Sequence, residues 1–420
     1  MGGGLLAGRR RIATVFLAFA FAYFFSTLVR AITATLSPVL TAEFALESRD
    51  LGLLAGGYFL GFALTQLPMG TWLDRHGPKR VIVCFLSVAV AGCLLFSMAT
   101  HFSLLLAARV LTGVGVSACL MAPLTGYRRW LTPPMQLRSN SWMLMVGSTG
   151  LVGATLPVQW LMPYLGWRPL FWLLAAAVLV SMALIAWAAP AWRNDDAAAD
   201  EAEKAGNCEE AGYAAVFRDP FFRKLAPIGF FNYGGFVAMQ TLWVVPWLTR
   251  VAGYTPQQAA GALFWISIAL LATYWLWGVA NPRLAQRGIP AARLLSWGLP
   301  LGMLVFALIL IAGAAAGTLA WAAFLCATTV VTLAQPAVAL ALPTALAGRA
   351  LSAYNLVVFA GVFVVQWGVG LLIDLFTRAG FGTLASFRAA LSVLLACCVM
   401  SYIYFLWAPP HNRRVVLRPA

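Results

Sequence analysis

One arginine stands in the middle of the first long apolar segment, which runs from Ile12 to about Leu40. A charged side chain near the centre of a bilayer costs at least about 2.5 kcal/mol, so it is rarely found there without a partner or a task. On a helix, positions three, four or seven residues from Arg30 share its face, and they hold Tyr23, Ser26, Thr27, Thr33 and Ser37. This polar stripe predicts that Arg30 faces protein or water and not lipid.

No acidic residue lies at the depth of Arg30 to balance its charge. Eight of the thirteen acids fall in one polar stretch between residues 191 and 223, and the others lie at the ends of apolar segments: Glu43, Glu47, Asp50, Asp74 and Asp374. A guanidinium offers paired hydrogen bonds to a carboxylate or phosphate and does not lose its proton. We therefore expect Arg30 to bind an anionic substrate. The alternative is an arginine satisfied by carbonyls and hydroxyls for packing alone, which we favour for Arg109.

The composition identifies a membrane protein. Hydrophobic residues make up 62% of the chain and charged residues only 10%, with a mean hydropathy of +0.85, far from the values of soluble domains. The net charge of +15 does not indicate nucleic acid, because the basic residues lie in short segments between apolar runs, as in proteins oriented by a bilayer. The seven cysteines form no CxxC pair, so we expect no metal, cofactor or catalytic group, and no enzyme.

Apolar runs of about 20 residues, long enough to cross a bilayer, predict twelve transmembrane helices. They lie near 12–40, 51–73, 81–100, 104–126, 141–164, 169–190, 225–248, 259–280, 294–314, 318–343, 353–376 and 387–408. We divide the chain into a six-helix half, 1–190, an acidic linker, 191–223, and a second six-helix half, 224–420. Most of the basic residues fall on the side of the linker, which places both termini in the cytoplasm, with the protein in a bacterial inner (plasma) membrane.

The stretch "GTWLDRHGPKR", residues 70–80, joins the second and third predicted spans. With twelve spans in two halves, it resembles the loop motif of the major facilitator superfamily, and "AARVLTGVGVSA" around Arg109 resembles a second element of that family. The resemblance implies an all-α fold of two pseudo-symmetric halves. It also implies that Asp74 latches the halves on the cytoplasmic side, near Gly348 and Arg349; the alternative is an anchor of topology with no role in motion. The predicted gating and motif residues are Gly70, which would allow close helix approach, Asp74, Arg75, Gly77, Lys79, Arg80 and Arg109.

The first and seventh spans are equivalent in the two halves, and each has a proline late in the helix. Pro38 follows Arg30 by eight residues, and Pro246 follows Ala238 by the same number. The first pattern resembles organophosphate/phosphate antiporters, which carry an arginine in both slots; alanine in the second slot favours a singly charged ligand such as a monocarboxylate. The predicted binding residues are Arg30, Tyr23, Thr27, Thr33, Tyr58, Asn232, Tyr233, Gln240, Trp243, Tyr354 and Asn355. Other polar residues in the spans, such as Tyr274 and Gln335, could complete the cavity, but most of them are expected to join helices.

These observations favour a monomeric secondary transporter that moves a small organic anion by exposing a central site alternately to each side of the bilayer. Proton coupling would have to run through the substrate's own carboxylate or through water beside Arg30, since no buried acid or histidine is available. The alternatives are an exporter of hydrophobic or cationic compounds, which would be expected to have acids within the first half, and a transporter-like solute sensor.

Overall fold

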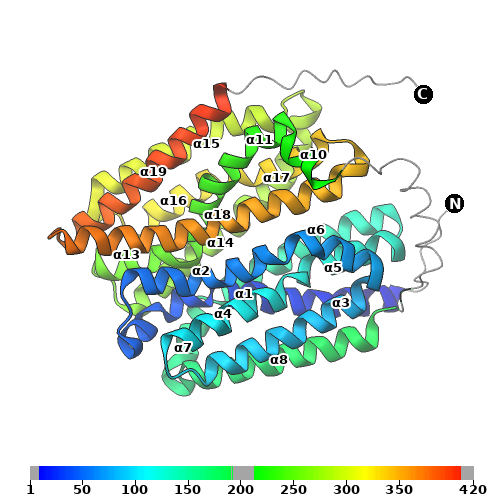
Figure 1. Cartoon of the computed structure of the whole chain (residues 1–420), viewed down its shortest axis with the longest axis horizontal. Helices are drawn as coiled ribbons and strands as arrows, with labels where there is room; N and C mark the ends of the chain where they lie inside the picture. The colour runs from blue at the N-terminus through cyan, green and yellow to red at the C-terminus, as the bar shows by residue number, and fades with distance from the viewer. Residues whose placement is uncertain (1–8, 191, 193–211, 408–420) are drawn as a thin grey trace.

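The computed structural model describes residues 9–190, 192 and 212–407, and this part of the chain contains helices and no strand (Figure 1). The first half comprises α1 (Arg9–Phe44), α2 (Ser48–Leu64), α3 (Gln66–Ser97), α4 (Phe102–Val116), α5 (Ala118–Trp130), α6 (Pro133–Gly153), α7 (Leu156–Leu165) and α8 (Trp167–Ala188). The second half begins with α10 (Tyr213–Arg218), α11 (Pro220–Pro227), the π-helix η1 (Ile228–Tyr233), α12 (Gly234–Ala238), the π-helix η2 (Met239–Trp243) and α13 (Val244–Arg250). It ends with α14 (Pro256–Gln286), α15 (Ala291–Ala312), the 3₁₀ turn η3 (Gly313–Ala315), α16 (Thr318–Thr328), the 3₁₀ turn η4 (Thr329–Leu333), α17 (Ala334–Ala341), α18 (Thr344–Arg378) and α19 (Thr383–Trp407).

The described helices account for the twelve predicted passes. Ten helices are long and apolar enough to cross a membrane, and the α6–α7 pair, bent by 45°, makes eleven. The remaining pass is α2 together with the first part of α3, because α3 turns at Gly77, where φ is 76° and ψ is 159°. A positive φ of this kind suits glycine, which has no side chain to clash with the backbone. The charged stretch at residues 70–80 is therefore not a free loop, since helix flanks Gly77 on both sides.

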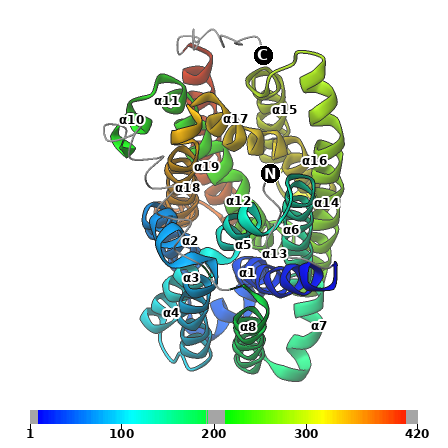
Figure 2. The same cartoon turned by 90° about the vertical axis from the view of Figure 1, so that its right-hand side faces the viewer.

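The chain forms two bundles that meet along a few helices. In Figure 2, α1, α3, α4 and α8 lie in the lower part and α15, α16, α17 and α19 in the upper part. The first bundle is held by packing of α3 on α4 and α8 and of α1 on α6, and the second by packing of α18 on α19 and α15 on α16. Between the bundles, the most extensive contact is α2 on α18, and α14 packs on α6 and α7.

Antiparallel passes place the helix connections at two ends of the molecule. The end that holds the α1–α2 and α18–α19 connections is called here the Asp374 end, and the end that holds Gly77 and α10 is called the linker end. Which end faces the cytoplasm stays a prediction, as do the boundaries of the two halves.

Part of the predicted linker is ordered helix. Residues 212–223 hold α10 and the start of α11, and Asp219 caps α11 by accepting hydrogen bonds from the backbone N–H groups of Phe221 (2.9 Å) and Phe222 (3.1 Å). A carboxylate at a helix N-terminus satisfies donors that have no partner within the helix. The acid-rich part of the linker, 193–211, lies outside the described residues.

Candidate functional site

Arg30 lies on α1 where the two halves face each other. Its guanidinium is close enough to interact electrostatically with the phenol groups of Tyr23, Tyr58, Tyr233 and Tyr274. These tyrosines come from α1, α2, η1 and α14, so both halves contribute. Among the residues that the structure describes, Arg30 has no hydrogen bond and no ion pair, and its Nε atom is buried. A guanidinium in this situation retains its capacity to donate to an anion.

Only one of the four phenol hydroxyls near Arg30 has a hydrogen-bond partner among the described residues. The hydroxyl of Tyr58 donates to the main-chain oxygen of Ser26 at 3.3 Å. The hydroxyls of Tyr23, Tyr233 and Tyr274 make no hydrogen bond within the described ranges 9–190, 192 and 212–407. Tyr274, which the sequence offered only as one of several residues that could complete the cavity, therefore lies near the candidate site.

Arg109 occupies a packing position. It is fully buried on α4, its Nη1 donates to the main-chain oxygen of Val29 at 3.0 Å, and its guanidinium lies 5.3 Å from the ring centre of Tyr58. Its Nε and Nη2 have no hydrogen-bond partner in the described part of the protein. Arg109 thus supports the segment of α1 next to Arg30 and the ring of Tyr58, as in the packing interpretation favoured for it above.

The seventh pass carries four predicted binding residues, and all four lie in its two π-helices. The π-helix is rare and often occurs at functional sites. Tyr233 lies close enough to Arg30 to interact with it electrostatically, and Gln240 is buried with no partner for its Nε2 among the described residues. Asn232 instead donates to Ser401 Oγ of α19 at 2.8 Å, and Trp243 Nε1 donates to the main-chain oxygen of Gln366 at 3.2 Å.

Other predicted binding residues also join helices. The hydroxyl of Tyr354 donates to the main-chain oxygen of Leu225 at 3.4 Å, and Asn355 accepts a hydrogen bond from Gln335. The Thr27 hydroxyl bonds within its own helix and packs against Gly150 of α6, and Thr33 is buried. Of the predicted binding residues, Tyr23, Tyr58 and Tyr233 therefore lie near Arg30. Five others make contacts between helices instead: Thr27, Asn232, Trp243, Tyr354 and Asn355. Helical periodicity gives a residue's face but does not say which neighbour that face meets.

The motif residues at the linker end differ in part from our expectations. Asp74 is exposed and has no hydrogen bond or ion pair within the described chain, so the latch to the start of α18 is not made in this conformation. A Cβ built on Gly70 would meet nothing within 4 Å, so the close approach predicted there is absent. The close contact is at Gly77, which packs against Trp192, while Lys79 donates to the main-chain oxygen of Ala189 at 3.1 Å. Arg75 and Arg80 are exposed.

Tyr213 of α10 ties the described part of the linker to the first half through a side-chain hydrogen bond. Its hydroxyl donates to the main-chain oxygen of Leu67 at 3.0 Å and also interacts with Ser352 of α18. Burial raises the pKa of this phenol, so it stays protonated and able to donate at neutral pH. Tyr213 therefore forms a polar link between α3 and α18 at the linker end.

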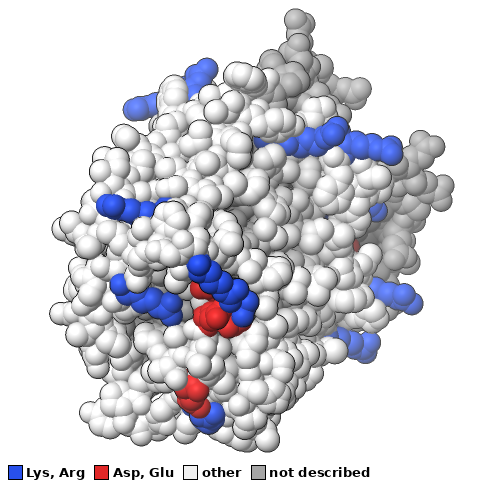
Figure 3. Space-filling model, turned by 60° about the vertical axis from the view of Figure 1, so that its left-hand side comes forward, with Lys and Arg blue, Asp and Glu red and all other residues white. Residues whose placement is uncertain are grey.

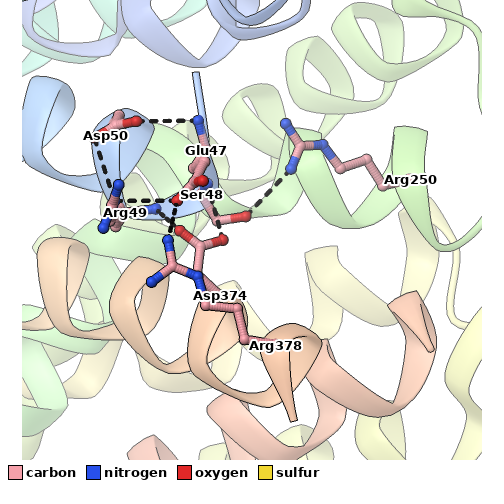
Figure 4. A network of polar contacts seen from close by, with 7 residues as sticks. All are labelled: Glu47, Ser48, Arg49, Asp50, Arg250, Asp374 and Arg378. Carbon is pink, nitrogen blue, oxygen red and sulfur yellow. Dashed lines mark hydrogen bonds and ion pairs between the residues drawn. The ribbon is translucent and has the colours of Figure 1, made fainter. Parts of the chain in front are cut away.

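The Asp374 end carries a denser network, drawn in Figure 4. Asp374 of α18 accepts hydrogen bonds from the backbone N–H groups of Ser48 (3.1 Å) and Arg49 (2.7 Å), at the first turn of α2. Arg250 donates to Ser48 Oγ at 3.3 Å, and Arg378 pairs with Glu47 at 2.8 Å. Figure 3 shows acidic side chains gathered among basic ones on an otherwise largely uncharged face.

The sequence held a signal for this network that we did not use. Gly370 and Asp374 have the same spacing as Gly70 and Asp74, G-x-x-x-D, and they stand near the end of α18 as the first pair stands near the end of the second pass. The described residues contain no group of His, Cys, Asp and Glu side chains that could hold a metal ion.

Two helical bundles that meet around Arg30 are an arrangement typical of membrane carriers of the rocking type. The family model of the Major Facilitator Superfamily matches residues 19–366, and the chain belongs to this family. It is 23% identical over 57% of its length to a probable sulfoacetate transporter of Cupriavidus necator, and 28% identical over 37% to a gallate transporter of Pseudomonas putida. The matches span 57% and 34% of those two relatives.

The fold also matches a solved structure over nearly the whole chain. A bacterial homologue of the human lysosomal transporter Spinster, solved in an inward-facing and unoccupied conformation, superposes with a TM-score of 0.76 at 17% identity. The match covers 96% of this chain and 98% of that protein. The all-α membrane fold of this family, predicted from the sequence, is confirmed.

Proposed function

We propose that this transporter carries a small organic monoanion, whose carboxylate binds Arg30 as the two halves alternately expose the site. The observation that carries the proposal is a half-buried guanidinium that has no hydrogen bond or ion pair in the described chain and interacts electrostatically with tyrosines from both halves. A single fixed positive charge matches a single negative charge and leaves a dianion partly uncompensated. The absence of an acid beside Arg30 disfavours export of cations.

Among organic monoanions, an aromatic acid suits the surroundings of Arg30 best. Four tyrosines interact electrostatically with the guanidinium, and three of their hydroxyls have no hydrogen-bond partner among the described residues. Rings offer stacking surfaces, and phenol hydroxyls donate to or accept from a polar group on the ligand. The gallate transporter relative agrees with this chemistry, whereas the sulfoacetate relative agrees only with a small anion.

Uptake into proteoliposomes tests the anion site directly. Labelled benzoate, 4-hydroxybenzoate, acetate and sulfoacetate are compared for the parent, Arg30→Lys and Arg30→Ala. Losing the paired hydrogen bonds of a guanidinium should weaken binding by about 2 kcal/mol or more, a factor of about thirty. Arg283→Ala is the matched control, because Arg283 is exposed and bonds only to the oxygen of Val279 in its own helix. Transport at the parental rate by both Arg30 variants would refute the proposal.

The ring preference has its own test. Tyr233→Phe and Tyr274→Phe keep the rings and remove the hydroxyls, so they should weaken 4-hydroxybenzoate relative to benzoate by about 1 kcal/mol, roughly fivefold. Equal uptake of acetate and both aromatic acids by the parent would remove the aromatic preference and leave the anion proposal intact.

A further inference from the structure

We infer that Asp374 is the gate residue that holds the Asp374 end closed, and that it does so by capping the helix of the opposite half. Its two carboxylate oxygens each accept a backbone N–H from the first turn of α2, at 3.1 Å from Ser48 and 2.7 Å from Arg49. The carboxylate belongs to the second half and the helix terminus to the first. The inference rests on the transporter family of the chain and not on the identity of its substrate.

The capping interaction is strong for a physical reason. The first N–H groups of a helix have no partner within the helix, and the helix dipole places partial positive charge there. A carboxylate that receives two such donors makes charge-assisted hydrogen bonds, which are roughly twice as strong as neutral ones. When the halves separate at this end, α2 loses these acceptors and its first turn must be satisfied by water.

The surrounding backbones show that this end is closed around the cap. A Cβ on Gly370 would lie 2.3 Å from the main-chain oxygen of Ser48, and a Cβ on Gly52 would lie 2.4 Å from that of Gln366. Only glycine permits α2 and α18 to approach so closely. The ring of Trp243 also packs at this junction, 3.2 Å from the position that a Cβ on Gly52 would take. Ser48 is buried, so the cap is sheltered from water on the side of α2.

The other polar contacts at this end are weaker candidates for the gate. The pair between Arg378 and Glu47 joins side chains that are 59% and 46% exposed, and exposed ion pairs contribute little because water and salt screen them. The contacts of Asp50 stay within the first half, to the N–H of Glu47 at 3.1 Å and to Arg49 at 3.7 Å. Among the contacts drawn in Figure 4, Asp374 combines a charge, partial burial and a partner in the opposite half.

The two aspartates that follow a glycine with G-x-x-x-D spacing differ in whether their carboxylates are hydrogen-bonded. Asp374 is engaged while Asp74, at the linker end, is exposed without a partner in the described chain. Releasing Asp374 should therefore favour the conformation in which the linker end closes, because the two halves rock as units. This reciprocity separates a gate from a residue that merely stabilises the fold.

Hydrogen–deuterium exchange of the full-length protein in lipid nanodiscs tests the inference. Asp374→Asn keeps the shape and removes the charge, and we expect about fivefold or faster amide exchange at residues 48–55. Exchange at residues 67–76 and 346–352, near the linker end, should become slower at the same time. Asp50→Asn is the matched control: it changes charge in the same cluster, and we expect it to leave exchange at the linker end unchanged.

A second variant approaches the cap from the other half. Ser48 is the first residue of α2, a position where proline fits a helix. Proline there removes the N–H that donates to Asp374 and also the hydroxyl that accepts from Arg250, so Ser48→Ala, which loses only the hydroxyl, is its control. Ser48→Pro should therefore reproduce the reciprocal exchange pattern of Asp374→Asn, even if one of the two variants fails to fold. Faster exchange at residues 48–55 without slower exchange at the linker end, or the same pattern in Asp50→Asn, would overturn the inference.

Discussion

The contact between α2 and α4 beneath the candidate site leaves no room for a methyl group. A Cβ built on Gly113 of α4 would lie 2.0 Å from the main-chain oxygen of Tyr58, 2.8 Å from its carbonyl carbon and 3.0 Å from its Cα. These are backbone atoms, which cannot rotate away. Gly113→Ala should therefore push α2 and α4 apart by about an ångström, since Cβ contacts shorter than 3.0 Å are essentially never observed. The displaced residue, Tyr58, stands beside both Arg30 and Arg109.

The magnitude follows from comparison with a glycine that has free space. Gly278 of α14 is exposed, and a Cβ there would meet nothing within 4 Å. Both Gly113→Ala and Gly278→Ala gain the better helix propensity of alanine, about 1 kcal/mol. The difference between the two variants therefore isolates the steric overlap at Gly113, and overpacking of this kind costs about 1 to 3 kcal/mol.

Thermal unfolding of the purified variants in one detergent, followed by uptake in proteoliposomes, measures the effect. At roughly 2 °C per kcal/mol for a chain of this size, Gly113→Ala should unfold several degrees below Gly278→Ala and should transport more slowly. The parent provides the baseline for both properties. If Gly113→Ala matches Gly278→Ala in stability and uptake, the tight packing of α2 on α4 and its support of the site are refuted.

Two further substitutions separate packing residues from binding residues. Asn232→Ala should lower the free energy of unfolding by about 1 kcal/mol, because it removes the bond to Ser401, and it should leave the KM for the transported anion unchanged; a large rise in KM at constant stability would return Asn232 to the binding site. Arg109→Met removes a bond to Val29 and a contact with the ring of Tyr58 but also removes two buried donors that have no partner in the described chain. These effects oppose each other, so the free energy of unfolding should change by no more than about 1 kcal/mol, as measured by thermal unfolding. A decrease in stability several times larger would show that the buried charge itself holds α1 and α4 together.

Local composition was enough to predict the passes of this fold. An apolar run of about 20 residues has one stable solution in a bilayer, a helix, because no water is present to satisfy an open backbone. The interruptions within passes were harder to foresee. The seventh pass contains two π-helices, η1 and η2, and no residue pattern in Ile228–Trp243 predicted them. The first of them packs tightly on α18, since a Cβ on Gly361 would lie 2.4 Å from the main-chain oxygen of Phe230.

The sequence by itself determined that a membrane-embedded arginine, Arg30, lacks an acidic partner nearby, because so few acids occur in the chain and all of them lie outside the apolar cores. It also determined the polar face of α1 that carries this arginine. Only the tertiary structure decided which distant side chains lie near Arg30. Tyr233 and Tyr274 do so, whereas Asn232 bonds to α19. The tertiary structure alone joined Asp374 to the start of α2, across more than three hundred residues. Helical periodicity fixes the direction of a side chain about its own axis, whereas the partner depends on how whole helices pack.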